Sequence, residues 1–406
     1  MIDTVKTDYI AREEKYGAHN YHPLPVVLAK GKGVFLWDTD GKRYYDFLSA
    51  YSAVNQGHCH PRIVDALTEQ AQILTLTSRA FYNNLTGEFE EYITKLFGYQ
   101  KVIPMNSGAE GVETAIKLCR KWAYEVKGIP EDEAIIITCL DNFHGRTTTI
   151  ISFSTDVQSK KNFGPHTPGF KTIPYNDLNA LAESLENKNV AGFLVEPIQG
   201  EAGVKVPDEG YLSEAYRMCK EKNVLFIADE IQTGLSRTGK MLCCDYENVR
   251  PDILILGKAL SGGTMPVSAV LADDEIMLTL KPNEHGSTYG GNPLACSVAI
   301  TSLQVLLDER LAENAFYLGN IFREELRKLK SNVITVVRGK GLLNAIVVNP
   351  KNGKEAWDLC LALRDNGLLA KPTHGDKIRF APPLVITEEQ VMECVEIIIK
   401  TVVSFE

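Results

Sequence analysis

The sequence predicts an α/β fold in which a three-layer large domain with a mostly parallel sheet is joined to a smaller α+β domain. Apolar runs typical of buried strands alternate with helical stretches through the middle of the chain, and this alternation indicates a parallel sheet covered by helices on both faces. From Pro293 onward the pattern changes to a long helical stretch, short strands and a closing helix. The chain of 406 residues also exceeds the size of one hydrophobic core, so roughly two domains are expected.

These patterns divide the chain into three segments. Residues 1–49 are expected to form an N-terminal segment with a hairpin that joins the smaller domain. Residues 50–290 form the predicted large domain, and residues 291–406 form the C-terminal part of the smaller one. A composition of 44% hydrophobic and 23% charged residues is ordinary for a globular protein.

The first predicted elements are a hairpin, a helix and a strand–helix unit. Residues 34–38 and 43–47 flank Asp40-Gly41, a dipeptide typical of hairpin turns. A helix is expected after Pro61. Residues 102–105 predict a short strand, and the pair Ser107 and Glu110 has the spacing of a capping box that opens a helix to about residue 126.

Four more strands are expected at residues 134–138, 191–196, 224–228 and 253–256, with helices at 177–186 and 211–222. These runs are almost continuously apolar, as expected of strands in a sheet covered on both faces. The C-terminal part predicts a long helical segment from Pro293, short strands at 333–337 and 342–348, and a closing helix from Glu388.

Charge and composition exclude several classes of partner. A net charge of -9 and a pI near 5.5 argue against nucleic acid or an anionic membrane as the main partner. Nine scattered cysteines indicate free thiols. No metal site is expected, because the run His58-Cys59-His60 lacks a second pair of ligands.

No membrane-spanning segment or signal peptide is expected. No apolar stretch has membrane-spanning length, and the N-terminus lacks the charged and apolar regions of a signal peptide. We therefore expect a cytoplasmic protein, with a mature mitochondrial enzyme whose presequence has been removed as the alternative.

Lys258 and Asp229 are the most informative residues, because each directly follows an apolar run. The carboxyl ends of parallel strands share one edge of a sheet, where open α/β sheets bind ligands, so the amine and the carboxylate are expected to meet over one crevice. This pair suits pyridoxal phosphate, because a desolvated lysine forms a Schiff base and an acidic side chain keeps the pyridine nitrogen protonated. A structural ion pair at the sheet edge is the alternative that the pair alone leaves open.

Two other segments could contact such a cofactor. Ser107-Gly108-Ala109 would present backbone N–H groups and a hydroxyl at the start of a helix, where phosphate binds well. Phe143 and Arg146 follow a strand end, so Phe143 could stack on a flat ring and Arg146 could bind a carboxylate. Each signal is weak when taken alone.

Six longer segments decide between these alternatives: GAHNY at 17–21, YSAVNQGH at 51–58, EPIQGEAG at 196–203, DEIQTG at 229–234, GKALSGG at 257–263 and HGSTYGGNP at 285–293. On these segments the chain resembles the class III, fold-type I aminotransferases over nearly its whole length. The resemblance implies the fold-type I architecture and a pyridoxal 5′-phosphate cofactor. Intact Lys258 and Asp229 argue against a cofactor-binding relative that has lost catalysis.

The resemblance implies a role for each residue around the cofactor ring. Lys258 would form the Schiff base and move protons during catalysis, and Asp229 would pair with the pyridine nitrogen. Gln232 would reach the ring hydroxyl, and Phe143 would stack on the ring face.

The resemblance also implies a homodimer with a shared active site, with higher oligomers left open. Ser107, Gly108 and Ala109 would hold the phosphate. Ser287 and Thr288 would complete this site from the partner subunit, as they do in the family.

The implied substrates are L-ornithine, which would give up its δ-amino group, and 2-oxoglutarate. Tyr21 and Arg146 would hold the amino acid end of ornithine, Tyr51 would lie along its chain, and Glu201 and Arg379 would form a switchable pair. Tyr21 and Tyr51 favour ornithine over N-acetylornithine, N-succinylornithine and 4-aminobutyrate, which lack the free α-amine that Tyr21 would bind. An aminomutase acting on glutamate semialdehyde is a further relative.

His144 is a departure from the pattern expected for ornithine. Tryptophan is expected there in the animal members that act on ornithine, and histidine in many members that act on N-acetylornithine. The residue therefore bears on the substrate, and little on the chemistry.

Overall fold

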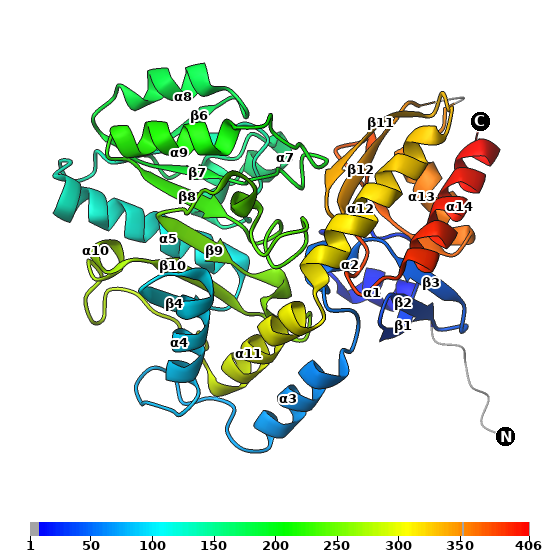
Figure 1. Ribbon diagram of the computed structural model, residues 1–406, viewed down its shortest axis with the longest axis horizontal. Coiled ribbons are helices and arrows are strands. Elements are labelled where there is room, and N and C mark those ends of the chain that lie inside the picture. The colour runs from blue at the N-terminus through cyan, green and yellow to red at the C-terminus, as the bar shows by residue number, and fades with distance from the viewer. Residues whose placement is uncertain (1–7, 351–352, 406) are drawn as a thin grey trace.

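The computed structural model describes residues 8–350 and 353–405. Figure 1 shows two lobes: a large lobe built on one seven-stranded sheet, and a small lobe with two four-stranded sheets. This mixed α/β architecture confirms the predicted fold class. The domain boundaries at residues 49/50 and 290/291 stay predictions.

The large sheet has the strand order β4 (Lys101–Met105), β10 (Ser268–Ala272), β9 (Ile253–Leu256), β8 (Leu225–Asp229), β7 (Val190–Val195), β5 (Ile135–Cys139) and β6 (Phe170–Ile173). Strand β10 runs antiparallel to both of its neighbours. The pairings from β9 through β8, β7 and β5 to β6 are parallel. The strand ends that carry Asp229 and Lys258 are therefore neighbours at one edge of the sheet.

Helices cover both faces of this sheet. Helix α5 (Gly108–Trp122) packs on one face, where Ile253 and Ile255 lie buried against it. The other face is covered by α8 (Leu178–Leu185) and α9 (Tyr211–Glu221), and further along by α4 (Thr86–Phe97) and α11 (Pro293–Asp308). Leu254 and Leu256 belong to this second layer. The alternation within β9 shows why the whole strand is apolar: both of its faces are buried.

The small lobe contains two sheets. One has the order β1 (Leu28–Lys32), β2 (Phe35–Asp38), β3 (Arg43–Asp46) and β13 (Leu368–Leu369), and the other has the order β11 (Ile334–Lys340), β12 (Leu343–Val348), β15 (Lys377–Phe380) and β14 (Lys371–Thr373). The helices of this lobe are α12 (Leu311–Lys328), α13 (Ala356–Asp365) and α14 (Glu388–Phe405). Strand β3 pairs in parallel with β13, so the N-terminal hairpin is part of this lobe.

Short elements connect these layers. They are α1 (Tyr9–Tyr16), α2 (Ser49–Ser52), α3 (Pro61–Ala71), a π-helical turn (Ala123–Lys127), α6 (Thr148–Ser152), α7 (Val157–Lys160), α10 (Asp274–Met277), and two 3-10 turns (Cys243–Glu247 and Lys258–Ser261). Within the described residues, no helix combines the length and apolar character needed to cross a membrane.

Several predicted boundaries differ from the structure. The long helical segment from Pro293 is two helices, α11 and α12. Arg310, which lies between them, has a φ of 51° and interrupts the helical conformation. Helix α5 ends at Trp122 and continues only as the π-helical turn. Helix α4 and strands β6 and β10 were not predicted, because their apolar runs are short or mixed with polar residues.

Candidate active site

The ends of β4, β5, β7, β8 and β9 meet around one cavity of about 200 Å³. Its lining contains six of the nine predicted cofactor residues: Gly108, Ala109, Phe143, Asp229, Gln232 and Lys258. The other lining residues are His144, Gly145, Glu196, Ile198, Glu201, Ile231 and Thr233. Lys258 and Asp229 thus lie over one crevice, as the positions of the two apolar runs predicted.

Lys258 begins a 3-10 turn directly after β9 and has a positive φ of 46°. This backbone conformation is disfavoured for a side chain with a Cβ, and it lets the side chain enter the cavity at the strand end. Burial lowers the pKa of the Lys258 amine, although the carboxylates of Glu201 and Asp229 oppose this shift. A lowered pKa makes the neutral, nucleophilic amine more available at neutral pH.

Asp229 ends β8 with a buried carboxylate that has two polar partners. Its Oδ2 lies 2.7 Å from Nδ1 of His144, and its Oδ1 accepts the N–H of Ile231 at 3.1 Å. Burial lowers the pKa of His144, but its hydrogen bond to Asp229 and the charge of that carboxylate raise the pKa overall. The hydrogen bond to His144 therefore holds the Asp229 side chain in place in a buried site.

Glu196 follows β7 and is a second buried carboxylate in the cavity wall. It accepts the backbone N–H of Phe143 at 2.9 Å. Burial raises the pKa of Glu196 to about 7, against the opposing effect of His144. Its position after an apolar strand is the same signal that pointed to Asp229, so sequence reasoning could have found it.

The first turn of α5 supplies the predicted phosphate cradle. Ser107 caps the helix: its Oγ accepts the N–H of Glu110 at 3.2 Å, and its own N–H donates to the Glu110 carboxylate at 2.7 Å. The N–H groups of Gly108 and Ala109 have no acceptor among the described residues, and both residues line the cavity. Free N–H groups at a helix start favour a bound anion.

Phe143 and Gln232 lie in the cavity wall as predicted. The Gln232 side chain donates to the backbone oxygen of Tyr51 at 3.3 Å. It also lies directly against Gly200, where an added Cβ would come within 1.5 Å of Oε1. The Gln232 side chain can therefore occupy this position only because residue 200 is a glycine.

The predicted substrate residues gather around Tyr51. The Arg379 guanidinium lies 5.0 Å from the centre of the Tyr51 ring. Burial raises the pKa of the Tyr51 hydroxyl, and Arg379 is the strongest opposing group. Glu201, Tyr21 and Arg146 also act on this pKa, and Glu201 is the direct partner of Arg379.

Glu201 and Arg379 form a direct ion pair at the edge of the cavity. Arg379 is 4% exposed, and its Nε has no hydrogen-bond partner within residues 8–350 and 353–405. Burial raises the pKa of Glu201, but the charge and hydrogen bond of Arg379 lower it overall. The pair is therefore charged, with a donor on Arg379 left for another ligand.

The remaining predicted residues lie further from the cavity. Tyr21 is 69% exposed, and the Arg146 guanidinium lies 5.5 Å from the Phe143 ring centre and donates to Ser159. Ser287 accepts a hydrogen bond from Asn106 of its own chain at 2.8 Å. The roles of Ser287 and Thr288 in a partner's site stay predictions.

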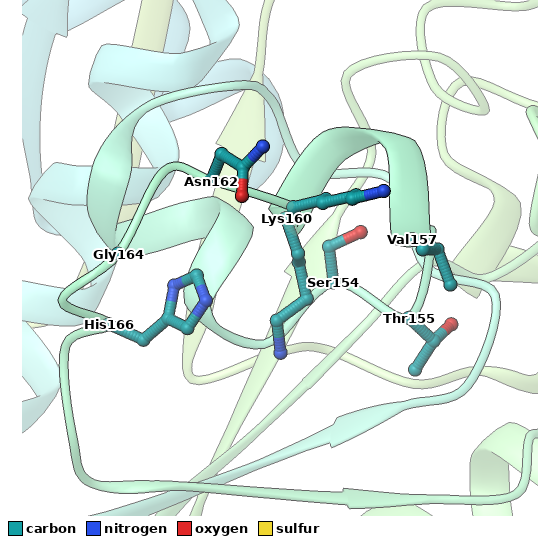
Figure 2. Close-up of a pocket in the computed structure, with 8 residues that line it drawn as sticks. Ser154, Thr155, Val157, Lys160, Asn162, Gly164 and His166 are labelled. Carbon is teal, nitrogen blue, oxygen red and sulfur yellow. The ribbon is translucent and has the colours of Figure 1, made fainter.

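Another hollow lies apart from this cavity. Figure 2 shows an open pocket lined by Ser154, Thr155, Val157, Lys160, Asn162 and His166, with Gly164 at its edge. Lys160 is half-buried and donates to the backbone oxygen of Ser152 at 3.0 Å. None of the predicted site residues contributes to it.

The sequence matches the class-III aminotransferase family over residues 16–402. The chain belongs to this family. The class-III aminotransferase described here is 64% identical to the mitochondrial ornithine aminotransferase of Rattus norvegicus, over 98% of this chain and 91% of that protein. It is 58% identical to the ornithine aminotransferase car2 of Schizosaccharomyces pombe, over 99% of this chain and 94% of that protein.

Solved structures of class-III aminotransferases have the same fold. The ornithine aminotransferase of Toxoplasma gondii superposes with a TM-score of 0.97 at 51% identity, covering 99% of this chain and 96% of that chain. An acetylornithine aminotransferase from Elizabethkingia anophelis superposes with a TM-score of 0.90 at 61% identity, covering 98% of each chain. The family, the fold and the aminotransferase chemistry predicted from the sequence are thereby confirmed.

Proposed function

We propose that this chain transfers the δ-amino group of L-ornithine to 2-oxoglutarate. The products are L-glutamate and glutamate 5-semialdehyde, which cyclises to pyrroline-5-carboxylate. The observation that carries this proposal is the arrangement of one cavity: Lys258, Asp229 and Glu201 line it, and Glu201 pairs with Arg379, which lies beside the Tyr51 ring. The relatives named above as ornithine aminotransferases support it.

The cofactor of this family is pyridoxal 5′-phosphate, and a Toxoplasma gondii ornithine aminotransferase structure has it at the active site. The residues of this chain fit the group. The free N–H groups of Gly108 and Ala109 suit a phosphate, the buried Asp229 suits a protonated ring nitrogen, and the flat ring of Phe143 lines the same cavity. Bound pyridoxal phosphate supplies an electron sink for charge that develops on the substrate carbon.

Lys258 has two tasks in this proposal. Its amine would hold the cofactor covalently, and the same amine would move a proton at the reacting carbon of the substrate. Both tasks need an uncharged amine, and burial lowers the pKa of Lys258 accordingly. Asp229, which is held by His144, would pair with the ring nitrogen and favour its protonated form.

The far end of ornithine would be bound away from Lys258. Arg146 would hold the α-carboxylate and Tyr21 the α-amine, and Tyr51 would lie along the carbon chain. The position of Arg146 beside Phe143, which lines the cavity, supports this role. Ornithine bound in this direction presents its distal amine to the cofactor.

A homodimer completes the proposed site. Ser287 and Thr288 of one subunit would hold the phosphate bound by Gly108 and Ala109 of the other. A cytoplasmic location stays part of the proposal, with the mitochondrial matrix as the alternative suggested by the names of the rat and fly relatives.

N-acetylornithine is the second candidate for the amino donor. The Elizabethkingia anophelis relative and the histidine at position 144 favour it, whereas the placement of Tyr21 and Tyr51 favours ornithine. The test is one assay that compares ornithine, N-acetylornithine and 4-aminobutyrate as donors, with 2-oxoglutarate as acceptor. The proposal expects the highest kcat/KM for ornithine, and a preference for N-acetylornithine would replace it.

A further inference from the structure

Tyr51 lies in a turn whose backbone is in the left-handed region. The four residues of α2, Ser49, Ala50, Tyr51 and Ser52, have φ values of 48°, 46°, 61° and 75°. In this left-handed region the Cβ of an L-residue approaches a carbonyl oxygen, so that only glycine, asparagine and aspartate adopt it readily. None of the four residues is of these types. The surroundings must therefore hold the turn in place.

Asp46 holds the entry of the turn. Its buried Oδ1 accepts the backbone N–H groups of Leu48 at 2.8 Å and Ser49 at 2.9 Å. Its other oxygen, Oδ2, lies 2.7 Å from Nε2 of His58. One buried carboxylate thus fixes the residue before the turn, Leu48, and the first left-handed residue, Ser49.

The exit of the turn is fixed to the large lobe. The side chain of Asn55 donates to the backbone oxygen of Leu235 at 2.8 Å and accepts from Arg237 at 2.6 Å. Gln56 donates to the backbone oxygen of Ala259, the residue after Lys258, at 2.9 Å. The exit is therefore tied to the elements that carry the cofactor residues, and the entry depends on Asp46.

The turn sets the position of one functional ring. The Tyr51 ring lies 5.0 Å from the Arg379 guanidinium, and the Tyr51 backbone oxygen accepts a hydrogen bond from Gln232. If the turn relaxed toward ordinary backbone angles, the Cα–Cβ direction of Tyr51 would rotate and the ring would leave this place.

We propose that Asp46 is a positioning residue for the choice of amino donor: it holds the left-handed turn, and through the turn it places Tyr51 along the substrate chain. This inference rests on the proposed function, in which Tyr51 favours ornithine over 4-aminobutyrate. Asp46 itself contacts neither the substrate nor the cofactor.

The first test compares two substitutions at position 46. Asp46→Ala removes the acceptor of both N–H groups, and the ratio of kcat/KM for ornithine to kcat/KM for 4-aminobutyrate should fall about tenfold or more. Asp46→Asn keeps an oxygen for the two N–H groups and an amide that can donate to His58, so its ratio should stay within about threefold of the wild type. An unchanged ratio in soluble Asp46→Ala overturns the proposal.

A double-mutant cycle tests the route through Tyr51. In a Tyr51→Ile background the ring is absent, so that adding Asp46→Ala should change the donor ratio little. If Asp46→Ala lowers the ratio by the same factor in both backgrounds, Asp46 acts independently of Tyr51 and the proposal is wrong. Val348→Ala, which removes buried methyl groups from the small lobe, controls for general destabilisation and should leave the ratio unchanged.

The exposed residue Ala50 gives a test that does not depend on Asp46→Ala folding. Ala50→Val makes the left-handed conformation less favourable and should lower the donor ratio, whereas Ala50→Gly relieves it and should partly restore the ratio of Asp46→Ala. No effect of Ala50→Val would contradict the proposal. A wild-type enzyme inactive with ornithine would instead contradict the proposed function, and its better donor would then replace ornithine in the cycle.

Discussion

The imidazole of His144 lies 2.7 Å from the carboxylate of Asp229, and the two side chains are only 1% and 5% exposed. Nε2 of His144 has no hydrogen-bond partner in the part of the chain that the structure describes, so the ring is held mainly through Asp229. The histidine therefore acts on the cofactor site through the charge and direction of Asp229. This accounts for a residue that the family resemblance marked only as a departure.

Replacing His144 should weaken the reaction without abolishing cofactor binding. A hydrogen bond to a charged group contributes about 1.5–3 kcal/mol, so His144→Ala should lower kcat roughly tenfold to a hundredfold. His144→Asn keeps a donor near Nδ1 and should retain more activity. Steady-state kinetics and the absorbance of the bound cofactor check this, and a His144→Ala enzyme with wild-type kcat would contradict it.

The same pair predicts a pH dependence of stability. The pKa of His144 is raised above 6.5 in the folded protein, because its hydrogen bond to Asp229 outweighs the effect of burial. A raised histidine pKa stabilises the fold fully below the unfolded value, and this contribution is lost as the pH rises through the folded pKa. The difference in unfolding free energy between wild type and His144→Ala should therefore shrink as the pH rises above 6.5 and through the raised folded pKa of His144, which urea unfolding would measure.

Lys258→Ala should bind pyridoxal phosphate yet fail to turn over. The proposed phosphate cradle of α5 and the Asp229 carboxylate remain, but the amine proposed to attach the cofactor and move the proton is gone. Gel filtration followed by absorbance measures retained cofactor, and a coupled assay measures glutamate. A variant that keeps most of the wild-type activity would refute the role of Lys258.

Tyr51→Ile should shift the choice of donor. The tyrosine ring lies beside Arg379, where an isoleucine leaves more space and no hydroxyl. Losing a positioned contact of this kind typically changes discrimination by about 1–3 kcal/mol, roughly tenfold to a hundredfold. The kcat/KM for 4-aminobutyrate relative to ornithine should rise accordingly. An unchanged ratio would mean that Tyr51 only packs.

Arg237 should be important for stability and for the contact between the lobes. This fully buried arginine donates to Asn55, to the backbone oxygen of Leu342 and to that of Pro382. Arg237→Met would leave these acceptors unpaired, at about 1–3 kcal/mol each. The urea midpoint should fall clearly, whereas Arg217→Met on the exposed face of α9 should change the unfolding free energy by less than about 1 kcal/mol.

The parts of the fold that local signals specify were predictable. Ser107 and Glu110 form their capping box within one helical turn, and the apolar runs before Asp229 and Lys258 place these residues at strand ends. Parallel strands then bring the two residues to one edge without further information.

The parts that depend on distant contacts were not predictable from local patterns. Nothing near Tyr51 indicates a left-handed turn, because the groups that hold its exit include Leu235 and Arg237, far along the chain. The pairing of His144 with Asp229 likewise joins residues 85 positions apart. Strand β10 lies between β4 and β9 and runs antiparallel to both. The short apolar run of β10 contains no local signal for the direction of the strand.

The pair of Glu201 and Arg379 should let one site accept two unlike substrates. Ornithine must react at its distal amine, whereas glutamate carries carboxylates at both ends and must react at its α-amine. An unpaired Arg379 would bind the α-carboxylate of ornithine and present the wrong amine. The ion pair seen in the structure would prevent this. The Nε of Arg379, which has no hydrogen-bond partner among the described residues, would give an incoming 2-oxoglutarate carboxylate a first donor. Glu201 would then swing away and leave Arg379 to the α-carboxylate, with Arg146 at the other end.

Two substitutions should therefore affect the two half-reactions in opposite ways. Removing one partner of a buried pair can cost roughly 3–5 kcal/mol, but here the released arginine gains the substrate as a ligand. Glu201→Ala should keep or speed the glutamate half-reaction, slow δ-transamination of ornithine and allow some reaction at its α-amine. Arg379→Ala should damage the 2-oxoglutarate step far more than the ornithine step. Stopped-flow absorbance of each half-reaction is the measurement, and an equal loss of both in Glu201→Ala would show that the pair is structural and that no switch operates.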